Sequence, residues 1–174
     1  MIAKAGDIYC VYNELFKKYT ACQVTKIDDS GKNPQAIILS LDWFGDKLPE
    51  LDDFAAVRPL YIDYMYWNRA LYMKKVDISV PPNYVYIGNL APINNDDTDT
   101  YGSWSNGHEV YNQFIWEKIP KDQRDAFKKA NLSDEFVEFE GKRRRIRTHN
   151  ENDNWHDFDD ALHLRVFPCL SSLT

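Results

Sequence analysis

Histidine and aspartate side chains gather near the C-terminus, where they could support metal-dependent chemistry. The group consists of His149, His156 and His163, spaced by seven residues, together with Asp153, Asp157 and Asp160. Imidazole and carboxylate groups are ligands for transition metals, so a metal-dependent hydrolase or nuclease is one candidate function. A spacing of seven aligns side chains only along a continuous helix, and this segment lacks a helical pattern. We therefore interpret these histidines as ordinary surface or core residues, with an enzyme site built from His149, Asp153 and His156 as the alternative.

A second segment, Asp97-Thr98-Asp99-Thr100-Tyr101-Gly102, begins like a calcium loop with glycine at the sixth place. The twelfth place is His108, so the loop lacks the bidentate glutamate that completes such a site. The chain also contains no glycine-rich phosphate loop, nucleophile elbow, C-x-x-C or H-E-x-x-H motif. These patterns predict no metal, no cofactor and no catalytic residue, and the protein is interpreted as a non-enzyme.

Three cysteines, Cys10, Cys22 and Cys169, fit no zinc or redox spacing. Cys10 and Cys22 lie in apolar, strand-like runs, which predicts buried free thiols and a reducing compartment.

The N-terminus has no signal-peptide pattern, and no apolar run approaches the roughly 20 residues that span a bilayer. We expect a cytoplasmic protein.

The basic run at residues 142–147 is Lys-Arg-Arg-Arg-Ile-Arg and could contact phosphates. In a strand its charges would point to both faces, and a strongly acidic segment follows it. A solvated hairpin edge is therefore favoured. A small nucleic-acid-binding module using this run with Trp155 remains a second alternative.

Two acidic segments carry aromatic residues and are the candidate binding surface. Carboxylates around aromatic anchors suit recognition of a basic protein, and the net charge of −6 favours encounter with one. The competing interpretation is that the aromatic side chains enter the core while the carboxylates are solvated. The predicted partner-binding residues are Asp96, Asp97, Asp99, Tyr101, Trp104, Asp153, Trp155, Asp157, Phe158, Asp159 and Asp160.

The elements that must position these residues are mostly strands. Alternating or apolar runs predict strands at residues 8–12, 22–27, 36–41, 76–80 and 84–88, and a last one at 162–167. A short helix is expected at 49–54, and 60–71 is ambiguous. Residues 94–107 are expected to form a long surface loop.

Apolar spacing predicts a helix at 109–119, with a strand through 114–116 as the competing interpretation, and a short polar helix follows at 121–130. A hairpin is expected from strands at 136–139 and 142–148 around Glu140-Gly141. The predicted fold class is α+β, with a bent antiparallel sheet, one or two helices and a C-terminal hairpin. An SH3-like partial barrel is one arrangement that the sheet could adopt. Length favours a single domain over residues 1–174, with a subdivision near residue 93 as an alternative.

The opening Gly6-Asp7-Ile8-Tyr9, followed by two strands, resembles the start of immunity proteins from bacterial polymorphic toxin systems, in particular the immunity protein 26 group. The segments Val80-Pro81-Pro82-Asn83-Tyr84 and Ile87-Gly88-Asn89 are similar to that group as well. The resemblance covers at most the first 95 residues, and no functional residue carries over from it.

The resemblance implies a non-catalytic antitoxin that neutralises the toxin domain of a contact-dependent inhibition or related secretion system. Such a protein would cover the active site or substrate surface of its toxin. Many such toxins are nucleases with basic clefts, so an acidic, aromatic-bearing surface would take the place of the nucleic acid. The expected partner is therefore a basic toxin domain, with no membrane or nucleic-acid partner.

Overall fold

The computed structural model describes residues 1–64, 69–118, 120–122, 124–125, 136–139 and 142–145. Contacts within the chain group it into two compact units, Met1–Gln113 and Phe114–Thr174. The division falls inside the helix α1 (His108–Lys118).

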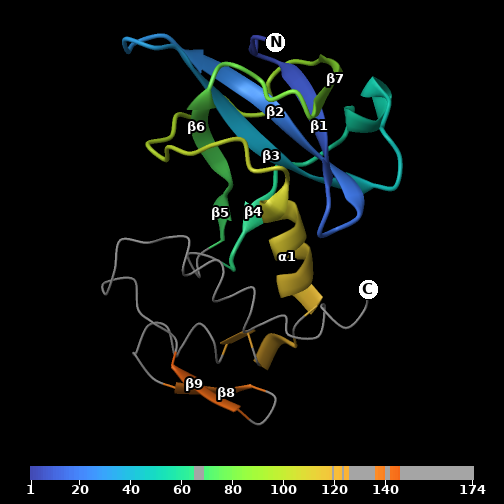
Figure 1. The fold of residues 1–174 in the computed structure, drawn as a ribbon, viewed down its shortest axis with the longest axis vertical. Coiled ribbons are helices and arrows are strands. Elements are labelled where there is room, and N and C mark those ends of the chain that lie inside the picture. The colour runs from blue at the N-terminus through green and yellow to red at the C-terminus, as the bar shows by residue number, and fades with distance from the viewer. Residues whose placement is uncertain (65–68, 119, 123, 126–135, 140–141, 146–174) are drawn as a thin grey trace. The chain divides into compact units, whose positions relative to one another are not determined.

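The first unit is built on a five-stranded antiparallel sheet with the strand order β6-β3-β2-β1-β7 (Figure 1). Consecutive strands β1, β2 and β3 pair as neighbours, and β7 returns to pair with β1. Register shifts in the β1–β7 and β2–β3 ladders mark bulges, which bend strands and increase their twist. The strands are β1 (Asp7–Asn13), β2 (Lys18–Asp28), β3 (Gln35–Gly45), β6 (Met73–Asp77) and β7 (Tyr84–Asn89).

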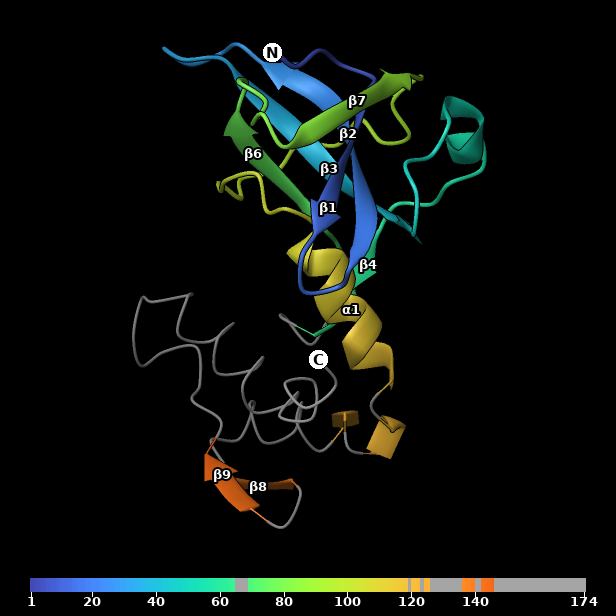
Figure 2. The ribbon, with the colours of Figure 1, turned by 45° about the vertical axis from the view of Figure 1, so that its right-hand side comes forward.

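Both faces of the central strands β1, β2 and β3 are buried, because their alternate side chains enter different apolar clusters. One cluster includes Tyr9, Cys22 and Trp104, and the other includes Cys10 and Phe54. The second cluster packs against η1 (Leu51–Phe54), a single 3-10 turn. In the rotated view of Figure 2, η1 lies beside the sheet, on the side away from β6.

Smaller elements complete the two units. In the first, β4 (Tyr61–Ile62) pairs with β5 (Ala70–Leu71). In the second, β8 (Phe136–Phe139) pairs with β9 (Lys142–Arg145) as an antiparallel hairpin. No helix in the described part of the chain is both long enough and apolar enough to cross a bilayer.

The start of α1 is defined by two residues with positive φ, Asn106 at 54° and Gly107 at 70°. Asn106 is held by three hydrogen bonds: its N–H donates to the Tyr84 hydroxyl, its carbonyl accepts from Asn13, and its side chain accepts from Asn83. A Cβ at position 107 would lie 1.8 Å from the Oγ1 atom of Thr20. Glycine is therefore required where the helix begins against β2.

The α+β prediction is confirmed, with an open five-stranded sheet and no closed barrel among the described strands; the SH3-like form stays a prediction. The helix expected at 109–119 exists, so the competing strand through residues 114–116 is wrong.

The strand expected at 76–80 begins three residues earlier and ends at Asp77. The ambiguous stretch at 60–71 contributes β4 and β5. The hairpin is confirmed; its second strand, expected at 142–148, is described as far as Arg145, and the strand at 162–167 lies outside the described residues.

Candidate functional site

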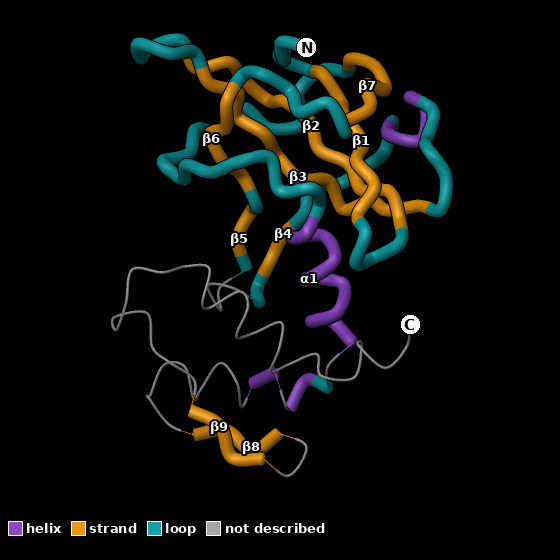
Figure 3. Tube along the Cα trace, in the orientation of Figure 1, coloured by secondary structure: helices purple, strands orange, loops and turns teal. Residues whose placement is uncertain are grey.

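The long segment between β7 and α1 contains the first group of predicted binding residues, and we call residues 94–103 the acidic loop. Figure 3 shows it as an extended loop that passes along β6 before the chain enters α1. It forms no regular helix or strand, as the polar composition predicted. Its position is nevertheless fixed by contacts with the sheet.

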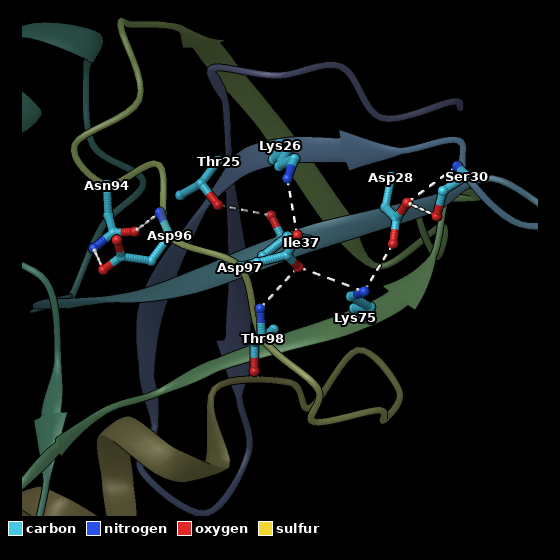
Figure 4. Close-up of polar contacts among 10 residues, drawn as sticks. All are labelled: Thr25, Lys26, Asp28, Ser30, Ile37, Lys75, Asn94, Asp96, Asp97 and Thr98. Carbon is cyan, nitrogen blue, oxygen red and sulfur yellow. Dashed lines mark hydrogen bonds and ion pairs between the residues drawn. The ribbon is translucent and has the colours of Figure 1, made fainter.

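Asp97 provides the main attachment of the acidic loop (Figure 4). One carboxylate oxygen lies 2.9 Å from Nζ of Lys26 in β2, and the other lies 3.4 Å from Nζ of Lys75 in β6. Lys75 also forms an ion pair of 2.8 Å with Asp28. Two lysines from separate strands therefore hold one aspartate of the loop, and Asp28 balances the second positive charge.

These ion pairs change the pKa values of the groups involved. The Lys75 ammonium and hydrogen bonds from Ser30 hold the pKa of Asp28 well below its usual range. Lys26, together with the backbone N–H of Thr98, lowers the pKa of Asp97. The pKa of Lys75 is raised, mainly by its hydrogen bond to Asp28. All three groups are therefore charged at neutral pH.

Backbone hydrogen bonds add a second attachment at the edge of the sheet. The N–H of Lys75 donates to the carbonyl of Thr100 at 2.8 Å, and the N–H of Gly102 donates to the carbonyl of Lys75 at 2.9 Å. The result is a short parallel bridge between Lys75 and Tyr101. The loop thus covers the edge of β6, which protects that edge from pairing with other strands.

Of the predicted binding residues in the acidic loop, Asp96, Asp99 and Tyr101 are exposed beside the anchored Asp97. Tyr101 is 66% exposed, although the Lys75 ammonium lies 5.7 Å from its ring centroid. The Asp96 carboxylate accepts a hydrogen bond of 2.9 Å from the side chain of Asn94. These three residues present two carboxylates and one aromatic ring from a backbone that is anchored at Asp97.

Trp104 is not part of this exposed set but lies in the core, which is the competing interpretation of the sequence for this residue. Its side chain is buried, with 9% exposed, and its indole N–H donates to the carbonyl of Asp77 at 3.0 Å. The ring packs edge-on against Tyr9 and Tyr84, with centroids 5.8 and 4.9 Å away. Trp104 therefore anchors the C-terminal end of the loop in the core.

Asp97, another of the predicted binding residues, is held between two lysines of the sheet, and its side chain is 55% exposed. The sequence does not indicate these two lysines as partners of Asp97. Two consecutive lysines, Lys74 and Lys75, suggest a surface position from the sequence. Both are nevertheless buried in β6, with 6% and 8% exposed. Their partners Glu109, Asp28 and Asp97 come from distant parts of the chain, so no local signal indicates them.

The motifs that carry the resemblance have structural roles at a corner of the sheet. Gly6 has a φ of +88°, and a Cβ there would lie 2.5 Å from the carbonyl oxygen of Leu90. The buried Asp7 carboxylate accepts hydrogen bonds from the backbone N–H of Lys4, the Tyr9 hydroxyl and the Asn89 side chain. These residues join the start of β1 to the end of β7 and do not form an exposed site.

The remaining predicted residues fall outside the part of the chain that the structure describes. They are Asp153, Trp155, Asp157, Phe158, Asp159 and Asp160, together with His149 and His156 of the alternative enzyme site. Within the described residues, no three histidine, cysteine, aspartate or glutamate side chains converge as a metal site would require. Of the basic run, residues 142–145 form β9.

Comparison of the chain with protein-family models, curated proteins and solved structures finds no match in any of the three.

Proposed function

We propose that the protein is a cytoplasmic immunity protein that binds and neutralises a basic, nuclease-type toxin domain of a contact-dependent inhibition or related secretion system. The observation that carries the proposal is the fixed, outward-facing set Asp96, Asp99 and Tyr101 on the acidic loop. A rigid binding segment loses little conformational entropy on association, so its contacts contribute more of their energy to affinity.

The chemistry of this set fits a nucleic-acid-binding cleft. Carboxylates can occupy positions where phosphates would contact lysines and arginines, and a tyrosine ring can stack where a base would. The net charge of −6 would accelerate encounter with a basic partner. The resemblance of short motifs within the first 95 residues to the immunity protein 26 group supports the same proposal.

The first test is an affinity purification of the tagged, full-length protein from its native host, with the genes that flank its own gene identified in parallel. A one-to-one complex with a basic domain encoded next to the gene is the expected result. The purified complex should lack nuclease activity that the free partner has. Recovery of no protein partner, with the gene standing alone, contradicts the proposal and puts the enzyme alternative first.

The second test maps the surface. Tyr101→Ala should weaken the complex by about tenfold or more, as expected for an aromatic anchor at an interface. The double change Asp96→Lys with Asp99→Lys should slow association, and this effect should shrink at high salt. Asp52→Lys is the matched control, because Asp52 is exposed on η1, which packs against β7 at the opposite edge of the sheet from β6. Equal effects at both sites would contradict a binding role of the acidic loop.

A further inference from the structure

A small cavity lies between the start of α1 and the face of the sheet against which Trp104 packs. Its polar lining comes from Thr20, Tyr84, Ser105 and Glu109, and most of the remaining lining is apolar. The centre of a water-sized molecule has about 10 Å³ of space there. That space corresponds to about one water molecule.

Glu109 lines this cavity and carries a carboxylate oxygen without a hydrogen-bond partner. The residue is 4% exposed, and its Oε1 atom accepts a hydrogen bond from the hydroxyl of Ser40 in β3. Its Oε2 atom is buried and has no hydrogen-bond partner among the described residues. A buried carboxylate oxygen without a donor is costly, so native structures normally supply one.

The charge of Glu109 does not require a cation in the cavity, because Lys74 already lies nearby. Lys74 is 6% exposed, and the negative charge of Glu109 opposes the lowering of the Lys74 pKa that burial causes. The carboxylate therefore has a compensating positive charge within the protein. What Oε2 lacks is a hydrogen-bond donor.

Tyr84 can supply a hydrogen-bond donor to a water molecule in the cavity. Its hydroxyl accepts a hydrogen bond of 2.9 Å from the backbone N–H of Asn106, which leaves its own proton to be donated. A water molecule needs two to four polar partners to be held in a buried site. Tyr84 can donate to such a water, Glu109 can accept from it, and Thr20 or Ser105 offers a further hydroxyl.

We propose that this cavity is a binding site for one structural water, which donates to Oε2 of Glu109 and accepts from the hydroxyl of Tyr84. The water connects the first turn of α1 to β7. It thereby completes the hydrogen bonds that hold Asn106 and Gly107 at the start of the helix. The inference is independent of the proposed toxin-binding function, since it concerns residues that are buried within the first unit.

The test is a high-resolution crystal structure of the full chain, with a second crystal soaked in rubidium chloride. The expected result is one water within about 2.6–3.2 Å of both Oε2 of Glu109 and the Tyr84 hydroxyl, with no anomalous rubidium signal. A direct hydrogen bond between Glu109 and Tyr84 would overturn the proposal, as would a dry cavity. A rubidium peak would overturn it in favour of a cation site.

Variants provide a readout in solution through magnetic relaxation dispersion of water oxygen, which detects waters that exchange slowly. Tyr84→Phe removes the donor hydroxyl. The relaxation dispersion signal should then decrease by the amount that one slowly exchanging water contributes. Glu109→Gln keeps an acceptor oxygen and should retain the water, while Ser40→Ala alters only the contact to Oε1 and serves as the matched control. An unchanged signal in Tyr84→Phe would contradict the bridge, whatever the stability of the variant.

Discussion

Lys75 in β6 and Asp28 at the end of β2 form an ion pair of 2.8 Å in which both side chains are largely covered, with 10% and 16% exposed. Asp28 also accepts hydrogen bonds from the backbone N–H and the hydroxyl of Ser30. Lys75 also forms an ion pair with Asp97, so the Lys75–Asp28 pair connects two strands of the sheet to the acidic loop. The stability of this connection depends on the ionisation of the two carboxylates.

Acidification should therefore weaken the fold through Asp28. Because its pKa is lowered in the folded state, its contribution to stability is fully present above the ordinary aspartate pKa of about 4 and is lost as the pH falls below that value. Asp28→Asn should lower the melting temperature at pH 7 and reduce its further decrease between pH 7 and pH 3. Thermal unfolding followed by circular dichroism measures both quantities.

The control for this prediction is Asp29→Asn, which changes the neighbouring carboxylate. Asp29 is exposed and forms no ion pair within the described part of the chain. Its replacement should leave the melting temperature and its pH dependence close to those of the unmodified protein. An identical acid response in Asp28→Asn and the unmodified protein would show that the Lys75–Asp28 pair contributes nothing to acid stability.

Asp97→Asn should loosen the acidic loop without unfolding the sheet. The neutral amide loses the charge attraction to Lys26 and Lys75, so the hydrogen bond from the Gly102 N–H to the carbonyl of Lys75 should open more often. Hydrogen exchange at the Gly102 amide should accelerate, whereas exchange in β1 should not change. Asp99→Asn is the matched control, and equal acceleration in both variants would argue against a specific role of Asp97.

Gly107→Ala should be strongly destabilising because two effects act at one position. The φ of 70° costs an L-residue about 1–2 kcal/mol, and the added Cβ would overlap the side chain of Thr20 at 1.8 Å. We expect a loss of more than about 2 kcal/mol in the free energy of unfolding, measured with urea. Gly31→Ala is the control, since its nearest neighbour would lie 3.8 Å away, and its effect should stay within about 0.5 kcal/mol.

The strands around the core were predictable because their alternating apolar residues act locally, through the period of two that a half-buried strand requires. The burial of Lys74 and Lys75 was not predictable, because it depends on carboxylates that only the fold brings near. Trp104 illustrates the same limit within the candidate site. Its acidic and polar neighbours in the chain suggested exposure, while its actual partners Tyr9 and Tyr84 lie far away in the sequence.

Trp104→Phe should distinguish the stability contributed by the indole hydrogen bond from the stability contributed by ring packing. Phenylalanine keeps a ring beside Tyr9 and Tyr84 but cannot donate to the carbonyl of Asp77. The expected loss is about 1 kcal/mol in the free energy of unfolding, compared with about 3–5 kcal/mol for Trp104→Ala, which also leaves a cavity. Urea unfolding of both variants measures the difference, and similar losses would mean that ring packing contributes little.

Cys10 and Cys22 should be unreactive free thiols in the folded protein. They lie on the paired strands β1 and β2, but Cys10 belongs to the apolar cluster on one face of the sheet and Cys22 to the cluster on the other. A disulfide between them is therefore excluded by geometry. Burial raises the pKa of Cys10 to about 12, and burial together with the charge of Glu109 raises the pKa of Cys22.

The measurement uses the Cys169→Ser variant, so that only these two thiols remain. A thiol reagent such as Ellman's reagent at pH 8 should detect no thiol in the folded state and two after unfolding in guanidinium, because only the exposed thiolate reacts. Oxidation of the folded variant should produce no intramolecular disulfide in mass spectrometry. Rapid labelling of either cysteine at neutral pH would contradict the buried arrangement and would mean that the sheet opens readily in solution.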